Sequence, residues 1–340
     1  MRVTRDSLIR IAKETVQQRA YNDRDIVAAY LTGSLLTEEP MLGGTADIDL
    51  VFVHKIRPVK RREFIKLTPD FHVDISHRAK EEFKAPREMR ADPWLGYEMY
   101  DPILLYESEK FFDFVQASLR AGFEFEQPPL MLQRCRQLYS HGRQIWMDLM
   151  DVGEKAGPKE VWQYFKSLFH AINVIVELSG PPIYERRLLL EFPARAEMVQ
   201  KPGMAAGALG LIGANKVDAE KIKGWVGDWK SAFEIACEKT SVDFRVHPAR
   251  LNYYEKAIKS MLESENSQAA IWPLITTWTL AVEVLEGDQF QFWQDACTEL
   301  GLLGKSFEER VQGLDQYLDE IDILLEEIAT ENGIDATAGI

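Results

Sequence analysis

Residues 30–34 read YLTGS and residues 47–53 read DIDLVFV, with twelve residues between them. An apolar run ends at Gly33-Ser34, and a second apolar run carries two acids at alternate positions. Because alternate side chains of a β-strand share a face, we expect Asp47 and Asp49 to point the same way, about 6.5–7 Å apart along the strand. Both carboxylates can then bind the same ions.

A third strand-like run, FHVDI at residues 71–75, places Asp74 on the face opposite Phe71, Val73 and Ile75. If the two acid-bearing strands are neighbours, Asp74 joins the first two carboxylates. Three converging carboxylates are typical of a site for hard cations, above all Mg²⁺, which bridges to substrate phosphates. His72 shares the face of Asp74 and could influence the charge state of that carboxylate. Alternatively, it is a histidine whose hydrogen bonds are satisfied within the protein or that faces solvent.

Each of these signals has an ordinary structural explanation when it stands alone. A lone pair of alternate acids is usually solvated on an edge strand, and a lone Gly-Ser is usually a turn. Together they favour a functional site, because acids inside apolar strands need a reason to be there. Gly33 would let the backbone approach a phosphate closely, and Ser34 would donate hydrogen bonds to it.

The 340 residues exceed one average domain, and the composition, 46% hydrophobic and 28% charged, is that of a globular protein. Residues 1–126 combine a helical opening with strand-like runs at 26–31, 48–53, 71–75 and 103–106. Residues 127–340 follow the break at Gln127-Pro128-Pro129 and read as successive helices. We therefore predict an α+β protein: an N-terminal domain with a mixed sheet and flanking helices, then an all-α helical bundle.

The last predicted helix has apolar residues at alternating steps of four and three, so it must pack against other helices. An intramolecular partner is favoured over another chain. These seam positions are Phe307, Val311, Leu314, Leu318, Ile321, Leu325 and Ile328.

The formal net charge is −14, divided as −3 before residue 127 and −11 after it. This charge argues against a nucleic-acid partner and favours cationic or metal-bridged ligands. Three cysteines without a CxxC pair support neither a disulfide framework nor a structural zinc. No signal peptide or membrane-spanning segment is expected, so we predict a cytoplasmic protein without a membrane partner, either a monomer or a homodimer.

The pattern of Gly33-Ser34, the twelve-residue gap, Asp47 and Asp49, and a later Asp74 resembles the polymerase-beta-type nucleotidyltransferase superfamily. The size and the helical second half resemble its aminoglycoside nucleotidyltransferases of the kanamycin and streptomycin type. The resemblance implies that Gly33 and Ser34 bind the triphosphate of ATP or another nucleoside triphosphate. It also implies that Asp47 and Asp49 bind two Mg²⁺ ions, and that Asp74 binds one of them and helps to activate the acceptor hydroxyl.

Residues 35–46 contain no Lys or Arg, although the family often has a basic residue there. Phosphate neutralisation is therefore expected from elsewhere, and the candidate is Lys166, on a predicted helix face with Trp162, His170 and Asn173. A solvated lysine is the alternative. Residues 60–62, read as three bases in a loop, could attract a polyanion or simply be surface charge.

Two classes of function follow. The first is a magnesium-dependent nucleotidyltransferase that works by a two-metal mechanism. It is expected to move a nucleoside monophosphate, AMP from ATP, to a hydroxyl of a small cationic acceptor such as an aminoglycoside. The second is a non-catalytic nucleotide-binding or protein-partner module that keeps the same fold. Three carboxylates held close together favour the enzyme, because a pure binder has no need for such repulsion.

Overall fold

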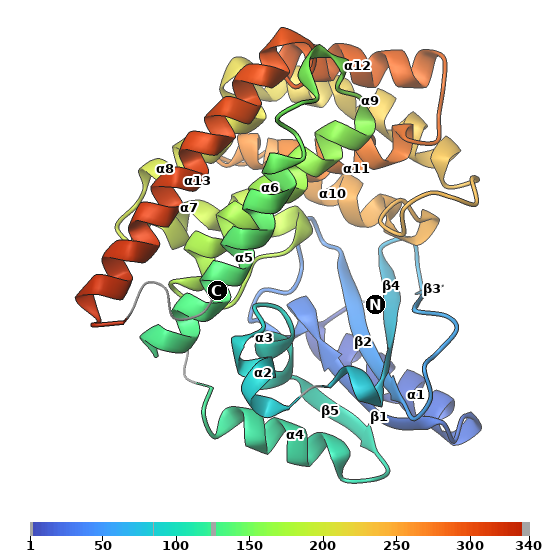
Figure 1. Cartoon of the computed structure of the whole chain (residues 1–340). Helices are drawn as coiled ribbons and strands as arrows, with labels where there is room; N and C mark the ends of the chain where they lie inside the picture. Colours follow the sequence, from blue (N-terminus) through green and yellow to red (C-terminus); the bar gives the residue numbers. More distant parts are fainter. Residues whose placement is uncertain (1–2, 84, 124–126, 335–340) are drawn as a thin grey trace. The chain divides into compact units, whose positions relative to one another are not determined.

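The computed structural model describes residues 3–83, 85–123 and 127–334. The chain divides into two compact units, residues 1–124 and residues 125–340 (Figure 1). The predicted domain boundary, between residues 126 and 127, falls beside residues 124–126, which lie outside the described residues.

The first unit contains α1 (Arg5–Asn22), β1 (Ile26–Thr32), β2 (Ala46–His54), β3 (Arg62–Lys66), β4 (Phe71–Ala79), α2 (Pro86–Ala91), α3 (Leu95–Tyr100), β5 (Ile103–Glu107) and α4 (Phe111–Arg120). A short 3₁₀ turn, Gly33–Leu36, follows β1 directly. The strands form one sheet in the order β3-β4-β2-β1-β5 (Figure 1). The pairing of β2 with β4 is parallel, and the other pairings are antiparallel.

One face of this sheet is apolar and packs against α1. Leu8, Ala12 and Val16 of α1 belong to the same buried cluster as alternate residues of the strands. The cluster takes these residues from the two acid-bearing strands: Ala46, Ile48, Leu50, Phe52, Phe71, Val73 and Ile75. The intervening residues, including the acids, therefore face the other side of the sheet.

The four predicted strands are present, each extended by one to four residues. The expectation that residues 60–62 form a loop is wrong at Arg62, because this residue begins β3. The strand has the sequence REFIK, and its side chains are half-buried or exposed. Such an edge strand lacks the apolar alternation that reveals a strand in a sequence.

The second unit contains α5 (Pro128–Met147), α6 (Pro158–Glu177), α7 (Leu188–Met198), α8 (Gly203–Ile212), α9 (Ala219–Ala236), α10 (Leu251–Leu262), α11 (Ile271–Val282), α12 (Asp288–Leu300) and α13 (Lys305–Glu331). Every residue of α11 is buried. The indole N–H groups of Trp229 and Trp293 donate hydrogen bonds to Thr277 and Thr279 on this helix, at 2.9 and 3.0 Å. These two buried indole groups are thus paired with threonine hydroxyls of α11.

Helix α13 packs within its own unit, against α5, α6 and α8. Six of its seven predicted seam residues are buried, and Ile328 is half-buried. The intramolecular interpretation of the seam is confirmed. The architecture is α+β, with a mixed sheet and helices in the first unit and a helix-rich second unit. Within the described residues, no helix is both long and apolar enough to cross a membrane.

Candidate metal centre

The parallel pairing of β2 with β4 brings the strand acids together on one face. In this register Asp49 lies opposite Asp74, and Asp47 lies opposite His72. Opposite residues of paired strands share a face, so the four polar side chains form one patch on the side away from α1. The sequence could place Asp47 with Asp49, whereas the neighbourhood of Asp74 depended on strand order.

Three of these side chains could hold a metal ion. One ligand atom each from Asp47, His72 and Asp74 lies within 4.8 Å of the other two. Their exposed fractions are 4%, 0% and 2%, so the group is buried. Two buried carboxylates at this separation repel each other unless a positive charge lies near them.

Asp49 lies against the Gly33 turn. A Cβ atom built on Gly33 would be 2.0 Å from Oδ2 of Asp49, and Gly33 has a φ of +77°. Only glycine meets both conditions, because it has no Cβ and adopts positive φ without strain. The turn and the second strand acid therefore pack directly on each other.

The backbone carbonyls of the segment after Gly33 accept hydrogen bonds from Thr37 and Arg5. Thr37 donates to the Ser34 carbonyl through its N–H, at 3.0 Å, and through its hydroxyl, at 2.8 Å. Arg5 Nε donates to the Leu35 carbonyl at 2.7 Å. The hydroxyl oxygen of Ser34 is buried and has no hydrogen-bond partner among the described residues. A hydroxyl without a partner can turn its hydrogen towards a ligand that accepts a hydrogen bond.

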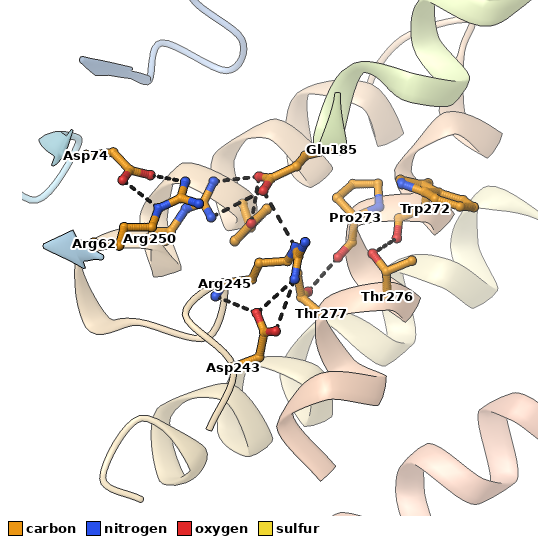
Figure 2. Close-up of polar contacts among 11 residues, drawn as sticks. Arg62, Asp74, Glu185, Asp243, Arg245, Arg250, Trp272, Pro273, Thr276 and Thr277 are labelled. Atoms are coloured by element: carbon orange, nitrogen blue, oxygen red, sulfur yellow. Dashed lines mark hydrogen bonds and ion pairs between the residues drawn. The ribbon is translucent and has the colours of Figure 1, made fainter. Parts of the chain in front are cut away.

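Arg62 of β3 binds the third acid. Its Nε donates to Oδ1 of Asp74 at 2.7 Å and its Nη2 donates to Oδ2 at 2.5 Å, a bidentate pair drawn in Figure 2. Such a pair combines charge with a fixed geometry. Asp74 is therefore held in one orientation and partly neutralised within the first unit.

Farther along the same face, Tyr30, Glu98 and Arg78 are joined by hydrogen bonds. The Tyr30 hydroxyl donates to Oε1 of Glu98 at 2.6 Å, and Arg78 donates to Oε2 at 2.7 Å. Burial and the neighbouring Glu98 raise the pKa of Tyr30 well above its ordinary value. Tyr30 therefore remains a protonated donor and contributes no negative charge to this face.

Lys166 lies in the other unit, on α6, and is half-buried. His170, one turn further along α6, stacks on His141 with ring centroids 4.9 Å apart. Burial lowers the pKa of His170 to about 4, and the charges of His141 and Lys166 act in the same direction. Lys166 and His170 thus lie close enough to interact, as their predicted helix face requires.

Asn173, the last residue of the predicted face, is covered by other parts of the helical unit. It is buried, donates to the Ile183 carbonyl at 3.2 Å and accepts from the Ile183 N–H at 2.8 Å. Its amide fixes the loop that follows α6.

A second charged cluster lies in the helical unit around Glu185 (Figure 2). Glu185 has a φ of +38°. Arg250 donates to both carboxylate oxygens at 3.3 and 2.5 Å, and Tyr254 donates to Oε2 at 2.9 Å. Arg245 lies 3.8 Å from Oε1 and also binds Asp243. Although burial acts in the opposite direction, the charges of Arg250 and Arg245 lower the pKa of Glu185 to about 2. Because its charges are paired internally, this cluster is structural.

Sequence reasoning missed the positions of two residues of the metal centre. The alternation of residues 71–75 placed His72 on the face of Asp74 but did not indicate that it lies opposite Asp47. Arg62 carried no signal, because its strand is polar and its partner is twelve residues away in sequence.

Among known proteins, a scan of family models and a search of curated proteins found no match to this chain.

Proposed function

We propose that the chain is a metal-dependent nucleotidyltransferase that moves a nucleoside monophosphate, AMP from ATP, to a hydroxyl of a small cationic molecule. The observation that carries the proposal is the register of β2 and β4, which places Asp47, Asp49 and Asp74 on one face beside the Gly33-Ser34 turn. These are the residue types that metal-dependent phosphoryl chemistry uses.

The donor set fits divalent cations. Asp47 and Asp74 would hold one ion, and Asp49 would share in holding a second, as the resemblance implies. When bound, the ions would activate the acceptor hydroxyl and neutralise charge on the triphosphate. Ser34 would donate its hydroxyl hydrogen to a phosphate oxygen, and Gly33 would let that phosphate approach the backbone. Lys166 stays the proposed phosphate-binding lysine of the helical unit.

The acidic balance of the chain supports a cationic acceptor. A net charge of −14 attracts cations from a distance and disfavours polyanions such as RNA. The class of acceptor we propose is therefore a hydroxylated amine, of which an aminoglycoside is one example. The cytoplasm stays the predicted compartment.

The experiment is a pyrophosphate-release assay with ATP, Mg²⁺ or Mn²⁺, and a panel of hydroxylated amines. The proposal expects release that depends on the metal, on an acceptor and on Asp47. The matched control is Asp101→Asn, because Asp101 is 83% exposed and pairs with Arg120 at the surface of the same unit. Release that survives Asp47→Asn unchanged would contradict the proposal.

A second candidate is a protein that binds nucleotide without transferring it. Arg62 favours this alternative, because it occupies both oxygens of Asp74, the acid assigned to activation of the acceptor. In that case ATP would bind and no acceptor would release pyrophosphate. The same assay, combined with a binding measurement, separates the two candidates.

A further inference from the structure

We propose that His72 is a metal ligand, and that the site formed with Asp47 and Asp74 takes a transition-metal dication such as Mn²⁺ or Zn²⁺ in preference to Mg²⁺. The inference rests on the proposed function and deepens it, since it names the kind of cation that the site selects.

Strand pairing fixes the position of the imidazole. His72 lies opposite Asp47 in the β2–β4 register, and Asp74 follows two residues later on the same face. The ligand atoms of the three side chains already lie within 4.8 Å of one another. Ligands of one metal ion lie about 3 Å apart, because each bond is about 2.0–2.2 Å long. Small side-chain rotations would therefore bring all three onto one ion.

Burial makes His72 unlike an ordinary surface histidine. Its exposed fraction is 0%, and its ring lies beside Phe64 of β3 with centroids 6.0 Å apart. Phe64 is opposite Asp74 in the β3–β4 register, so it shares this face of the sheet. The aromatic neighbour limits the rotation of the imidazole and keeps it next to the carboxylates.

The nitrogen donor determines which cation the site prefers. Mg²⁺ is bound by oxygen ligands and retains much of its water, whereas imidazole nitrogen is a ligand of zinc and other first-row transition metals. Two carboxylates and one imidazole leave positions for water or for phosphate oxygens, as catalytic metal sites do. An all-carboxylate site would lack this selectivity.

Arg62 is compatible with a metal on Asp74. Each carboxylate oxygen has two lone pairs, and Arg62 uses one on each oxygen. The guanidinium then acts as a partner that orients the ligand, a role that groups around metal sites commonly have. Asp47 and Asp49 supply the negative charge that Arg62 does not neutralise.

The test uses Mn²⁺ alone as the probe, bound to the full-length wild-type protein and studied by electron paramagnetic resonance. Pulsed spectra are expected to contain the ¹⁴N coupling of a directly bound imidazole. The coupling should disappear in His72→Leu and persist in His141→Gln, which changes an exposed histidine of the other unit. In a competition experiment between Mn²⁺ and Mg²⁺, His72→Leu should weaken Mn²⁺ binding at least about tenfold, or 1.4 kcal/mol. Its effect on Mg²⁺ binding should be much smaller.

Two results would overturn the inference, and they differ in what else they reject. Bound Mn²⁺ without ¹⁴N coupling in the wild type would remove His72 from the site and leave the carboxylate site of the proposed function standing. No binding of Mn²⁺ at all would reject both. Absence of the coupling from the wild-type spectrum overturns the inference by itself, so this outcome does not depend on the folding of a variant.

Discussion

Oδ2 of Asp49 lies 2.0 Å from the point that a Cβ atom of Gly33 would occupy. The end of β1 and the acidic part of β2 are therefore fitted to each other across the sheet, where Thr32 pairs with Asp49. The turn assigned to the triphosphate and an acid assigned to the metals form one structural element. A change in either residue should affect the other.

Gly33→Ala should destabilise the first unit and displace Asp49. Any L-residue at a φ of +77° costs about 1–2 kcal/mol, and the new methyl group would also overlap the carboxylate. We expect a loss of at least about 3 kcal/mol, with weaker binding of metal and ATP. Urea unfolding and calorimetry measure these effects.

Gly44→Ala is the matched control for this change. Gly44 has a φ of +72°, but no atom lies within 4 Å of its added Cβ. Only the backbone cost of about 1–2 kcal/mol should remain, without an effect on Asp49. Equal losses in the two variants would mean that the contact between Gly33 and Asp49 is unimportant.

Arg62→Met should make the stability of the protein depend on divalent cations. Asp74 is 2% exposed, so removal of its guanidinium leaves a buried carboxylate without that partner, which costs about 2–4 kcal/mol. Added Mn²⁺ should restore part of this loss and raise the melting temperature of the variant more than that of the wild type.

The control for Arg62 is Arg61→Met. Arg61 pairs with Glu82 at the surface and has a side chain that is 49% exposed, so its loss should cost less than about 1 kcal/mol. The proposed metal site predicts no greater response of this variant to Mn²⁺ than that of the wild type. A melting temperature of Arg62→Met that is insensitive to divalent cations would argue against metal binding at Asp74.

Glu185 should contribute to the acid sensitivity of the helical unit. Its pKa of about 2 lies below the ordinary value of 4.5, so its stabilisation is present above pH 4.5 and is lost as the pH falls towards 2. Glu185→Gln should lower the unfolding free energy at pH 7 by about 2–3 kcal/mol, because buried Arg250 loses its carboxylate.

Glu191→Gln provides the comparison at a surface pair of the same unit. Glu191 pairs with Arg187, four residues away, and is 42% exposed. Its replacement should therefore lower the unfolding free energy by about 0.5 kcal/mol or less. Chemical unfolding at pH 7 and pH 3 measures both variants. Similar losses in the two would refute a special role of Glu185.

His170 should act in a higher pH range, where protonation creates a partly buried positive charge instead of removing a negative one. Its folded pKa of about 4 lies below the ordinary 6.5, so the neutral ring stabilises the fold above pH 6.5, and this stability is lost between pH 6.5 and 4. The unfolding free energy should fall by about 1–2 kcal/mol over this range, after allowance for the partial exposure of the ring. NMR titration should place the His170 midpoint near pH 4, and a midpoint near 6.5 would contradict its burial.

Much of the first unit could be predicted because its strands alternate. Residues 46–52 and 71–75 place apolar side chains towards α1 and polar ones away from it, and this period is visible in the sequence. The Gly33-Ser34 turn could be predicted from residue types alone. The helical unit followed from its apolar spacing, including the seam of α13.

The remaining features depend on contacts between distant parts of the chain. Parallel pairing of β2 with β4 is a property of strand order, so the sequence could not place His72 opposite Asp47. β3 escaped prediction because it is a polar edge strand, and Arg62 was assigned to a loop for the same reason. Asn173 shares the helix face of Lys166, but tertiary packing pairs its amide with the Ile183 backbone, which the sequence could not indicate.

The central claim is a metal-dependent nucleotide site on the acid face of the sheet. Its most direct test is calorimetric titration with ATP, with and without Mg²⁺ or Mn²⁺, of the wild type, Asp47→Asn and the surface control Asp101→Asn. We predict that binding requires the divalent cation, persists in Asp101→Asn and weakens at least about 100-fold, or 2.7 kcal/mol, in Asp47→Asn. ATP binding that needs no cation, or that is unchanged in Asp47→Asn, would contradict the claim.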